Sequence, residues 1–423
     1  MQSVVITGVG AISAGAVGAH PLFARLAAGE SLIRANPALT ALGFANPWCV
    51  YIDDDTWAQL QPLIGAVDAD WGRQTQLALA AASLAAEQAK VTEVDSSSRT
   101  AIFVASNKHT FDEQHLAALA QVFDSSTELL DLDALLAAGN SSRDYFHKQQ
   151  DQAALAVGRR FGWPAHHGAR GEACAAGTMV IGSAMQQIRA GLLDIAIVGA
   201  TETMCNFTPL VAFNGVGALA SADKWQGSAI SRPFDKERCG FVMGEGSAFL
   251  VLESARHAAA RGATPLARIS GFAGLLEAYR ITASDDAGSE YARCMRAALA
   301  DAGLQPDDID HVNAHGTSTP TNDAAEALAL KQLFGERASQ LPVTSNKSAL
   351  GHSLANSGAV EAVLSVLSLQ QQLLLPTLNF TAGDDATSGL DIVTTARAQP
   401  LRRILSNSFG FGGVNACLVL EQA

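Results

Sequence analysis

The sequence Gly-Glu-Ala-Cys-Ala-Ala-Gly at residues 171–177 sets one cysteine, Cys174, in a run of small residues. The apolar residues that follow recur at helical spacing, and they are Ile181, Ala184, Met185 and Ile188. This pattern predicts a helix that begins near Cys174 and ends before Gly191. A short apolar run at residues 194–199 predicts a buried parallel strand. The stretch therefore predicts an α/β fold with a cysteine at a helix N-terminus.

A cysteine in this position can serve as a nucleophile. The free backbone N–H groups and the dipole of a helix N-terminus favour the thiolate, and small neighbours leave room for a substrate. The alternative is that Cys174 is buried as a small hydrophobic residue, which is a common role of free cysteine. This stretch by itself does not decide between the two roles.

Composition narrows the class of protein. The 423 residues are 48% hydrophobic and 16% charged, which is enough for one large or two medium cores. A net charge of −13 without a long basic run disfavours nucleic acid and anionic membranes as partners. Six scattered cysteines suit a reducing compartment better than a disulfide framework or a zinc site. With no signal-peptide pattern and no apolar run of membrane-spanning length, we expect a cytoplasmic protein.

Alternating strands and helices are expected in the first half. Apolar runs predict strands at residues 4–8 and 101–105, and the first of these turns out of the sheet at Gly8 and Gly10. Residues 75–90 predict a helix. Residues 107–150 are polar and predict an excursion of loops and amphipathic helices rather than sheet.

The second half repeats this order. A helix at 291–302 and a strand at 309–313 are followed by a turn and a helix after residue 351. The sequence Phe-x-x-Gly before an apolar run occurs at 241 and again at 409, and both runs end in Glu, at 253 and 421, so the offset is 168 residues each time. These repeats predict two similar α/β halves, residues 1–255 and 256–423, with the site between them.

Two histidines can complete a cysteine site, because a thiolate needs a proton acceptor and a stabilised oxyanion. His315 follows the 309–313 strand and precedes Gly-Thr-Ser-Thr-Pro, which suits a polar ligand. His352 stands at a turn before a helix, as Cys174 does. Taken alone, either histidine is more often structural than catalytic, by roughly two to one.

Five motifs, taken together, resemble the beta-ketoacyl-[acyl-carrier-protein] synthases of the elongating type, which include polyketide and aryl-polyene ketosynthases. The motifs are Cys174 in Glu-Ala-Cys-Ala-Ala-Gly, His315 in Asn-Ala-His-Gly-Thr-Ser-Thr-Pro, Lys347 with Gly351 and His352, residues 232–246, and residues 407–415. The match runs from residue 4 to residue 421. The resemblance implies the thiolase fold, which is a duplicated αβαβα layered architecture, and a dimer.

The resemblance also implies a reaction. Cys174 would take an acyl group from an acyl carrier protein, and malonyl on a second carrier protein would lose CO2 and attack that thioester. His315 and His352 would stabilise the enolate oxygen, and the backbone N–H groups of Cys174 and Phe411 would form an oxyanion hole. The substrates would arrive on phosphopantetheine, so the resemblance implies no cofactor and no metal.

Further residues are given roles by the same resemblance. Lys347 would orient the catalytic groups, with Glu326 as its ion-pair partner. Thr317 and Thr319 would contact the phosphopantetheine arm, and Phe411 would gate the acyl pocket. The alternatives are a surface lysine, threonines that only cap a turn, and a plain tight turn at residues 410–413. The partners would be an acyl carrier protein and either an identical chain or a ketosynthase-like one.

Three departures from the family pattern concern substrate choice. Glu172 stands two residues before the cysteine, Asn356-Ser357 replaces the usual Gly-Ala, and residues 107–110 replace a Gly-rich segment. They favour a specialised polyketide or aryl-polyene-type enzyme over a fatty-acid one.

Other classes of protein fit the sequence less well. A non-catalytic chain-length-factor-like partner typically lacks the cysteine. A thiolase uses a second cysteine as base, whereas Cys417 falls in the predicted last strand. Residues 8–13 lack the third glycine of a dinucleotide fingerprint.

Overall fold

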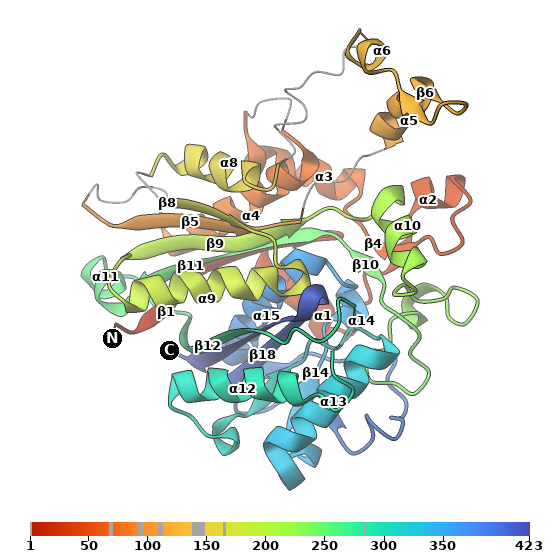
Figure 1. Cartoon of the computed structure of the whole chain (residues 1–423). Coiled ribbons are helices and arrows are strands. Elements are labelled where there is room, and N and C mark those ends of the chain that lie inside the picture. Colours follow the sequence, from red (N-terminus) through yellow and green to blue (C-terminus); the bar gives the residue numbers. More distant parts are fainter. Residues whose placement is uncertain are drawn as a thin grey trace.

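The computed structural model describes residues 2–66, 71–91, 93, 97–107, 113–137, 149–163, 166–282 and 284–423. Its helices and strands form five layers, seen edge-on in Figure 1. Outer helices cover one sheet, a central pair of helices lies between that sheet and a second one, and further outer helices cover the second sheet. This is the layered αβαβα architecture of the thiolase fold that the sequence predicts.

The strands of the first half are consecutive neighbours in the hydrogen-bonded order β1 (Val4–Ser13), β11 (Gly246–Ser254), β9 (Ile195–Glu202), β5 (Thr100–Ala105) and β8 (His166–Arg170). Those of the second half follow the order β12 (Ala267–Leu276), β19 (Val414–Gln422), β18 (Arg403–Gly410), β13 (His311–Asn313), β14 (Pro342–Thr344) and β16 (Asp391–Ile392). In both halves the first two pairings in this order are antiparallel and the next two are parallel. The two halves are therefore duplicates, joined where β1 pairs with β12.

Matching helices occupy matching layers. The outer helices are α3 (Asp54–Ile64), α4 (Arg73–Ala89) and α8 (Gln152–Phe161) on the first sheet, and α12 (Ser289–Ala302) and α13 (Pro320–Phe334) on the second. The central pair is α9 (Ala176–Arg189) and α15 (Ser357–Gln371), which contact strands of both halves. The predicted helices at 75–90 and 291–302 are confirmed as α4 and α12. The predicted boundary at residue 255 falls where α11 (Ala255–Ala260) begins and stays a prediction.

Gly8 and Gly10 do not turn the chain out of the sheet, so this expectation was wrong. Both lie inside β1, where a Cβ at either position would stand 2.2 Å from a carbonyl oxygen of α4. Gly271 of β12 has the same relation to α12, since its Cβ would stand 2.3 Å from the carbonyl oxygen of Ala298. Each strand also carries a register shift just before this glycine, at Gly8 and at Gly271. Glycine is needed in these strands because a helix backbone lies directly on them.

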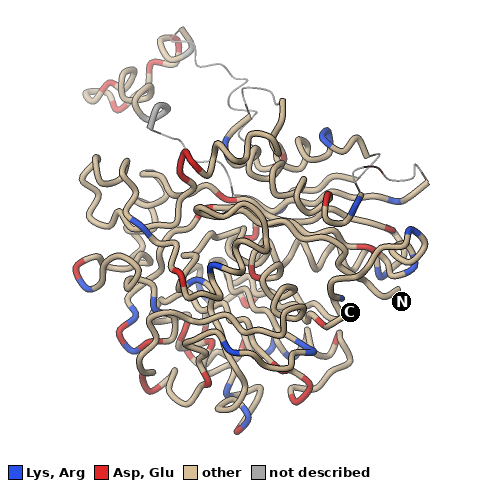
Figure 2. Tube along the Cα trace, turned by 180° about the vertical axis from the view of Figure 1, so that it is seen from behind, with Lys and Arg blue, Asp and Glu red and all other residues tan. Residues whose placement is uncertain are grey.

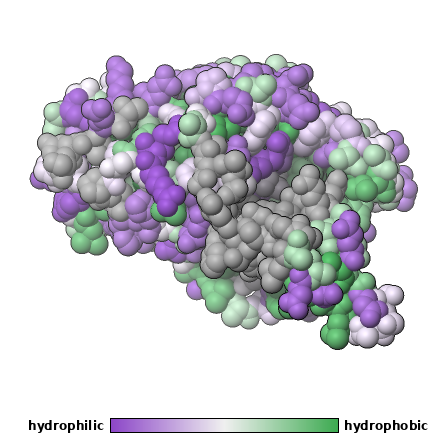
Figure 3. All heavy atoms as spheres, turned by 90° about the horizontal axis from the view of Figure 1, so that it is seen from above, coloured by the Kyte–Doolittle hydropathy of each residue, from purple (hydrophilic) through white to green (hydrophobic). Residues whose placement is uncertain are grey.

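The expected excursion at 107–150 is only partly described. Residues 108–112 and 138–148 lie outside the described residues, and between them are α5 (Glu113–Gln121), β6 (Phe123–Asp124), β7 (Leu129–Leu130) and α6 (Leu132–Ala137). The paired strands β6 and β7 correct the expectation of no sheet here. The segment projects from the body in Figure 1, and Figure 3 looks down on that side of the molecule.

Shorter elements complete the described chain: β2 (Ala16–Val17), α1 (Ala19–Ala27), β3 (Arg34–Ala35), α2 (Pro37–Ala41), β4 (Trp48–Val50), α10 (Phe207–Gly215), β10 (Met243–Gly244), α14 (Lys347–Leu350), β15 (Leu373–Leu374) and β17 (Arg397–Ala398). In the part of the chain that the structure describes, Lys and Arg are scattered among Asp and Glu rather than gathered into a stripe (Figure 2). None of the described helices combines the length and the apolar character that a membrane crossing requires.

Candidate active site

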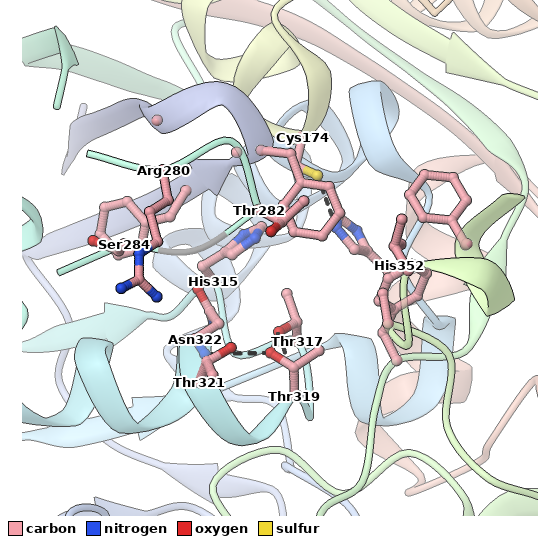
Figure 4. Close-up of a pocket in the computed structure, with 18 of the residues that line it drawn as sticks. Cys174, Arg280, Thr282, Ser284, His315, Thr317, Thr319, Thr321, Asn322 and His352 are labelled. Carbon is pink, nitrogen blue, oxygen red and sulfur yellow. Dashed lines mark hydrogen bonds between the residues drawn. The ribbon is translucent and has the colours of Figure 1, made fainter. Parts of the chain in front are cut away.

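Cys174, His315 and His352 meet in one cavity of about 360 Å³. The sulfur and one nitrogen of each ring all lie within 4.8 Å of one another. Figure 4 shows Cys174 above and between the two histidines, with Thr317 and Thr319 below. We call this cavity the Cys–His pocket. The three residues that the sequence selected, 178 positions apart at the extremes, are thus brought together.

Cys174 is presented by a sharp strand-to-helix turn. It lies in the 3-10 turn η1 (Ala173–Ala175), directly before α9, and its side chain is buried. The preceding Ala173 has a φ of 47°, a left-handed conformation that non-glycine residues rarely adopt. The matching turn η5 (Leu354–Asn356) before α15 repeats this feature, since Leu354 has a φ of 45°. Such strain persists where the surrounding structure demands it, and it is concentrated at functional sites.

His352 is hydrogen-bonded through both ring nitrogens. Its Nε2 lies 3.1 Å from Cys174 Sγ, and its Nδ1 lies 2.9 Å from the hydroxyl oxygen of Ser357. A hydroxyl can donate to or accept from Nδ1, so either neutral tautomer is satisfied. Ser357 belongs to the departure from the family pattern at 356–357, and sequence reasoning gave it no role at the site.

His315 is held mainly through its backbone. Its N–H donates to Glu326 Oε1 at 2.8 Å, and its carbonyl oxygen accepts from Lys347 Nζ at 2.6 Å. The Nδ1 of its ring is buried and has no hydrogen-bond partner among the described residues. The ring lies edge-on to His352 and to Phe409, with centroid distances of 5.3 and 6.0 Å.

Lys347 is buried and pairs with Glu361, so the prediction of Glu326 as its partner was wrong. Glu361 lies one helical turn after Ser357 on α15 and faces Lys347. Glu326, on α13, instead accepts from the backbone N–H groups of His315 and Gly316. Burial raises the pKa of both carboxyl groups to about 7, and Lys347 opposes that rise at Glu361. Glu326 therefore fixes the backbone of His315 directly, whereas Glu361 fixes Lys347, which in turn binds the His315 carbonyl oxygen.

Burial makes the resting pocket neutral. It raises the pKa of the Cys174 thiol to about 11, against the opposing effects of the Phe411 N–H and of Lys347. Burial, with Lys347 as a second cause, lowers the pKa of His315 and His352 well below the usual range. The helix N-terminus is expected to favour the thiolate, but burial outweighs that effect. Removing the thiolate from water raises its free energy by more than the helix dipole lowers it. The proton of Cys174 has a near acceptor in His352 Nε2.

Phe411 stands beside Cys174, in a turn whose Gly412 and Gly413 have φ of 82° and 77°. A Cβ on Gly410 would stand 3.3 Å from the Cys174 nitrogen, so a small residue lets the two backbones approach. The ring of Phe411 lines the pocket 6.4 Å from that of Phe213.

Thr317 and Thr319 both line the pocket, and their hydroxyl oxygens are 2.9 Å apart. Thr319 also caps α13 by accepting from the N–H of Asn322. The buried Asp323 accepts from the N–H groups of Thr317 and Ser318, a contact that sequence reasoning missed. The threonines therefore serve the turn and face the pocket at once.

Glu202 is another acidic residue that the sequence reasoning missed. It ends β9, is fully buried, and accepts from Asn107 Nδ2 at 2.7 Å and from the N–H of Ala355 at 3.3 Å. Burial raises its pKa to about 8. The sequence signal for such a residue is a glutamate at the end of an apolar strand, because a buried carboxyl group needs hydrogen-bond partners.

The model of the beta-ketoacyl synthase N-terminal domain matches residues 1–258, and that of the C-terminal domain matches residues 266–381. The chain belongs to the beta-ketoacyl synthase family. As a member of that family it is an acyltransferase, and the resemblance stated from its motifs is confirmed.

Curated members of the family match part of the chain. The 3-oxoacyl-[acyl-carrier-protein] synthase 2 of Staphylococcus aureus is 41% identical over 272 residues, 64% of this chain and 67% of that protein. The protein of the same name from Coxiella burnetii is 42% identical over 251 residues, 59% of this chain and 60% of its own length. The second alignment thus spans less than two thirds of that relative.

Solved structures match the whole chain. A ketosynthase of a type II polyketide synthase, bound to a hexaketide and in complex with its acyl-carrier protein, has a TM-score of 0.86 at 30% identity. The ishigamide ketosynthase/chain length factor has a TM-score of 0.86 at 31% identity, and a beta-ketoacyl synthase from Burkholderia phymatum 0.85 at 31%. These alignments cover 100% of this chain and 99–100% of the others.

Proposed function

We propose that this beta-ketoacyl synthase condenses an acyl group held on Cys174 with malonyl carried by an acyl carrier protein, with loss of CO2. The observation that carries the proposal is the 3.1 Å contact between Cys174 Sγ and His352 Nε2, with His315 in the same cavity. The site then holds a nucleophile and two histidines. His352 Nε2 can accept the thiol proton in one tautomer and donate in the other, because the Ser357 hydroxyl satisfies Nδ1 in both.

In the first stage, Cys174 Sγ attacks the carbonyl carbon of the incoming acyl thioester. Its proton passes to His352 Nε2 and then to the departing pantetheine sulfur, so the new thioester forms as the old one breaks. The backbone N–H groups of Cys174 and Phe411 stabilise the intermediate oxyanion. A donor of this kind contributes about 3 kcal/mol, because it is already aimed at the charge that develops.

In the second stage, the bond between the malonyl carboxylate and its α-carbon breaks, CO2 leaves, and the electron pair moves onto the thioester as an enolate. N–H groups of His315 and His352 donate to the enolate oxygen. The enolate carbon attacks the carbonyl carbon of the thioester on Cys174, and the C–S bond breaks as the β-ketoacyl product forms on the carrier protein. The departing Cys174 thiolate takes up one proton from water, which restores the thiol for the next cycle. Neutral histidines suit this stage since each retains one ring N–H that can donate to the enolate oxygen.

Further residues support these steps. Lys347 and Glu326 hold the backbone of His315, and Thr317 and Thr319 contact the phosphopantetheine arm. Phe411 gates the acyl pocket, because the glycines after it permit backbone movement. Substrates arrive on the carrier protein, so the proposal requires neither a cofactor nor a metal. Six cysteines without a disulfide support a reducing, cytoplasmic location.

The partner chain and the pathway are also part of the proposal. We favour a dimer, either of identical chains or with a ketosynthase-like partner, and polyketide or aryl-polyene synthesis over fatty-acid synthesis. The second candidate function is a non-catalytic partner, as in a chain length factor, because one neighbour is a ketosynthase/chain length factor. Cys174 and both histidines in one pocket support the catalytic role instead.

The mass of the intact protein after incubation with acyl carrier proteins of differing acyl group tests the proposal. The unaltered chain should gain one acyl group, and Cys174→Ala should gain none. Cys205→Ala is the matched control, because Cys205 is also buried and belongs to the same apolar cluster as Cys174. Acylation that survives Cys174→Ala, or that Cys205→Ala removes, contradicts the assignment. A chain that loads no acyl group, alone or with a partner ketosynthase, supports the non-catalytic function.

A further inference from the structure

We propose that Tyr291 is a positioning residue for His315 and acts on it through Phe409. The proposal rests on the proposed function, in which His315 serves only the decarboxylating stage. It gives a role to a residue of an outer helix that sequence reasoning did not connect with the site.

The two histidines of the pocket are oriented in different ways. The ring of His352 is tied at Nδ1 to Ser357. The ring of His315 has no such tie at Nδ1 within the described residues, although its backbone is fixed on both sides. Rotation about the side-chain bonds of His315 is therefore limited by packing, and the aromatic rings described against it are those of His352 and Phe409.

Phe409 is itself clamped by Tyr291. The two rings are stacked with centroids 3.7 Å apart and planes 10° apart, closer than the other described aromatic pairs. The Tyr291 hydroxyl donates to Asn322 Oδ1 at 3.3 Å, and burial raises the pKa of Tyr291, so the hydroxyl keeps its proton. Tyr291 also lines the Cys–His pocket, beside Ser284 and Asn322 (Figure 4 labels these two). Stacking, hydrogen bond and burial together fix this ring.

The backbone that carries Tyr291 is fixed as well. The preceding Gly288 has a φ of 71°, and a Cβ there would stand 2.1 Å from the carbonyl oxygen of Ala325 on α13. The carboxylate of Asp285 accepts from the N–H groups of Ser289 and Glu290 in the first turn of α12. Tyr291 therefore holds the Phe409 ring in a fixed position. A small displacement of that ring would displace the His315 ring, which donates to the enolate oxygen. A misplacement of 1 Å can cost about 100-fold in rate.

The test separates the two stages of the reaction. Tyr291→Leu removes the stack, and Tyr291→Phe keeps the stack while removing the hydroxyl. We expect Tyr291→Leu to acylate Cys174 at the unaltered rate and to lose about 10- to 100-fold in malonyl decarboxylation and condensation. Tyr291→Phe should retain most of both activities, because the stacked ring remains.

Phe334→Leu is the matched control. Phe334 is on α13, is 6% exposed like Tyr291, and packs in the same core without lining the pocket. The proposal is overturned if Tyr291→Leu lowers acylation and condensation equally, if condensation is unchanged, or if Phe334→Leu produces the same loss. An unaltered chain that never acylates would instead refute the proposed function, so the two failures are distinguishable.

Discussion

Burial disfavours the charged forms of Cys174, His315 and His352 in the Cys–His pocket. The Cys174 thiol and both imidazoles are neutral in the resting site because burial removes the water that would solvate their ions. Lys347 is a buried charge that acts on all three, and its partner Glu361 offsets it. The ammonium group of Lys347 also fixes the His315 carbonyl, so this ion pair links charge balance to geometry.

Loss of Glu361 should therefore destabilise the protein. Glu361→Leu leaves Lys347 buried without its carboxylate, and we expect the free energy of unfolding to fall by about 3–5 kcal/mol. The double variant Lys347→Met/Glu361→Leu should recover most of that loss in urea unfolding yet remain impaired in condensation, since His315 loses its donor. A single Glu361→Leu variant as stable as the unaltered chain would contradict this pairing. A fall in unfolding free energy with Glu326→Gln but not with Glu361→Leu would instead support Glu326 as the partner of Lys347.

At the scale of elements, the site depends on how closely the N-termini of α9 and α15 approach. Gly177 and Gly358 stand three residues after Cys174 and Ala355, and each faces the opposite helix. A Cβ on Gly177 would lie 2.7 Å from the Ala355 carbonyl oxygen, and one on Gly358 would lie 2.8 Å from the Thr178 nitrogen. These glycines let the turn of Cys174 meet the turn that follows His352.

Gly177→Ala should consequently move α9 and α15 apart and lengthen the distance between Cys174 Sγ and His352 Nε2. We expect a loss of about 1–3 kcal/mol in unfolding free energy from overpacking, with reduced acylation of Cys174. Gly215→Ala is a fitting control, because Gly215 is also helical and its Cβ would meet nothing within 4 Å. If thermal unfolding and acylation of Gly177→Ala match those of the control, the close crossing is not required.

Across the whole molecule, the duplication is symmetric in topology and asymmetric in chemistry. Ala355 occupies in η5 the position that Cys174 occupies in η1, directly before a central helix. The N–H of Ala355 is bonded to the buried carboxyl group of Glu202, whereas Cys174 faces the cavity. Of the two central helices, α9 therefore presents its N-terminal turn to the cavity through Cys174, whereas a buried acid is bonded to the corresponding turn before α15.

That acid predicts a pH dependence of stability. The pKa of Glu202 is raised from 4.5 to about 8, so between these values the folded chain holds a proton that the unfolded chain releases. The free energy of unfolding should therefore fall as pH rises from about 5 to 8, by up to about 1.4 kcal/mol per pH unit from this group. Glu202→Gln can keep both hydrogen bonds and should flatten that slope in urea unfolding at several pH values. An unchanged slope would show that Glu202 is already ionised in the folded chain.

The sequence by itself determined the α/β halves, their duplication and the three residues that meet in the Cys–His pocket. The periodicity of helices and strands is a local property of the sequence. Cys174, His315 and His352 can each be recognised from the motif formed by the neighbouring residues. It could not determine that Lys347 pairs with Glu361, that Gly8 and Gly10 lie beneath a helix, or that Tyr291 braces the site. It also left the ionisation of Cys174 open, because burial depends on all the surrounding elements. Only the tertiary structure decides such features, since each depends on the distance between segments that the local sequence does not set.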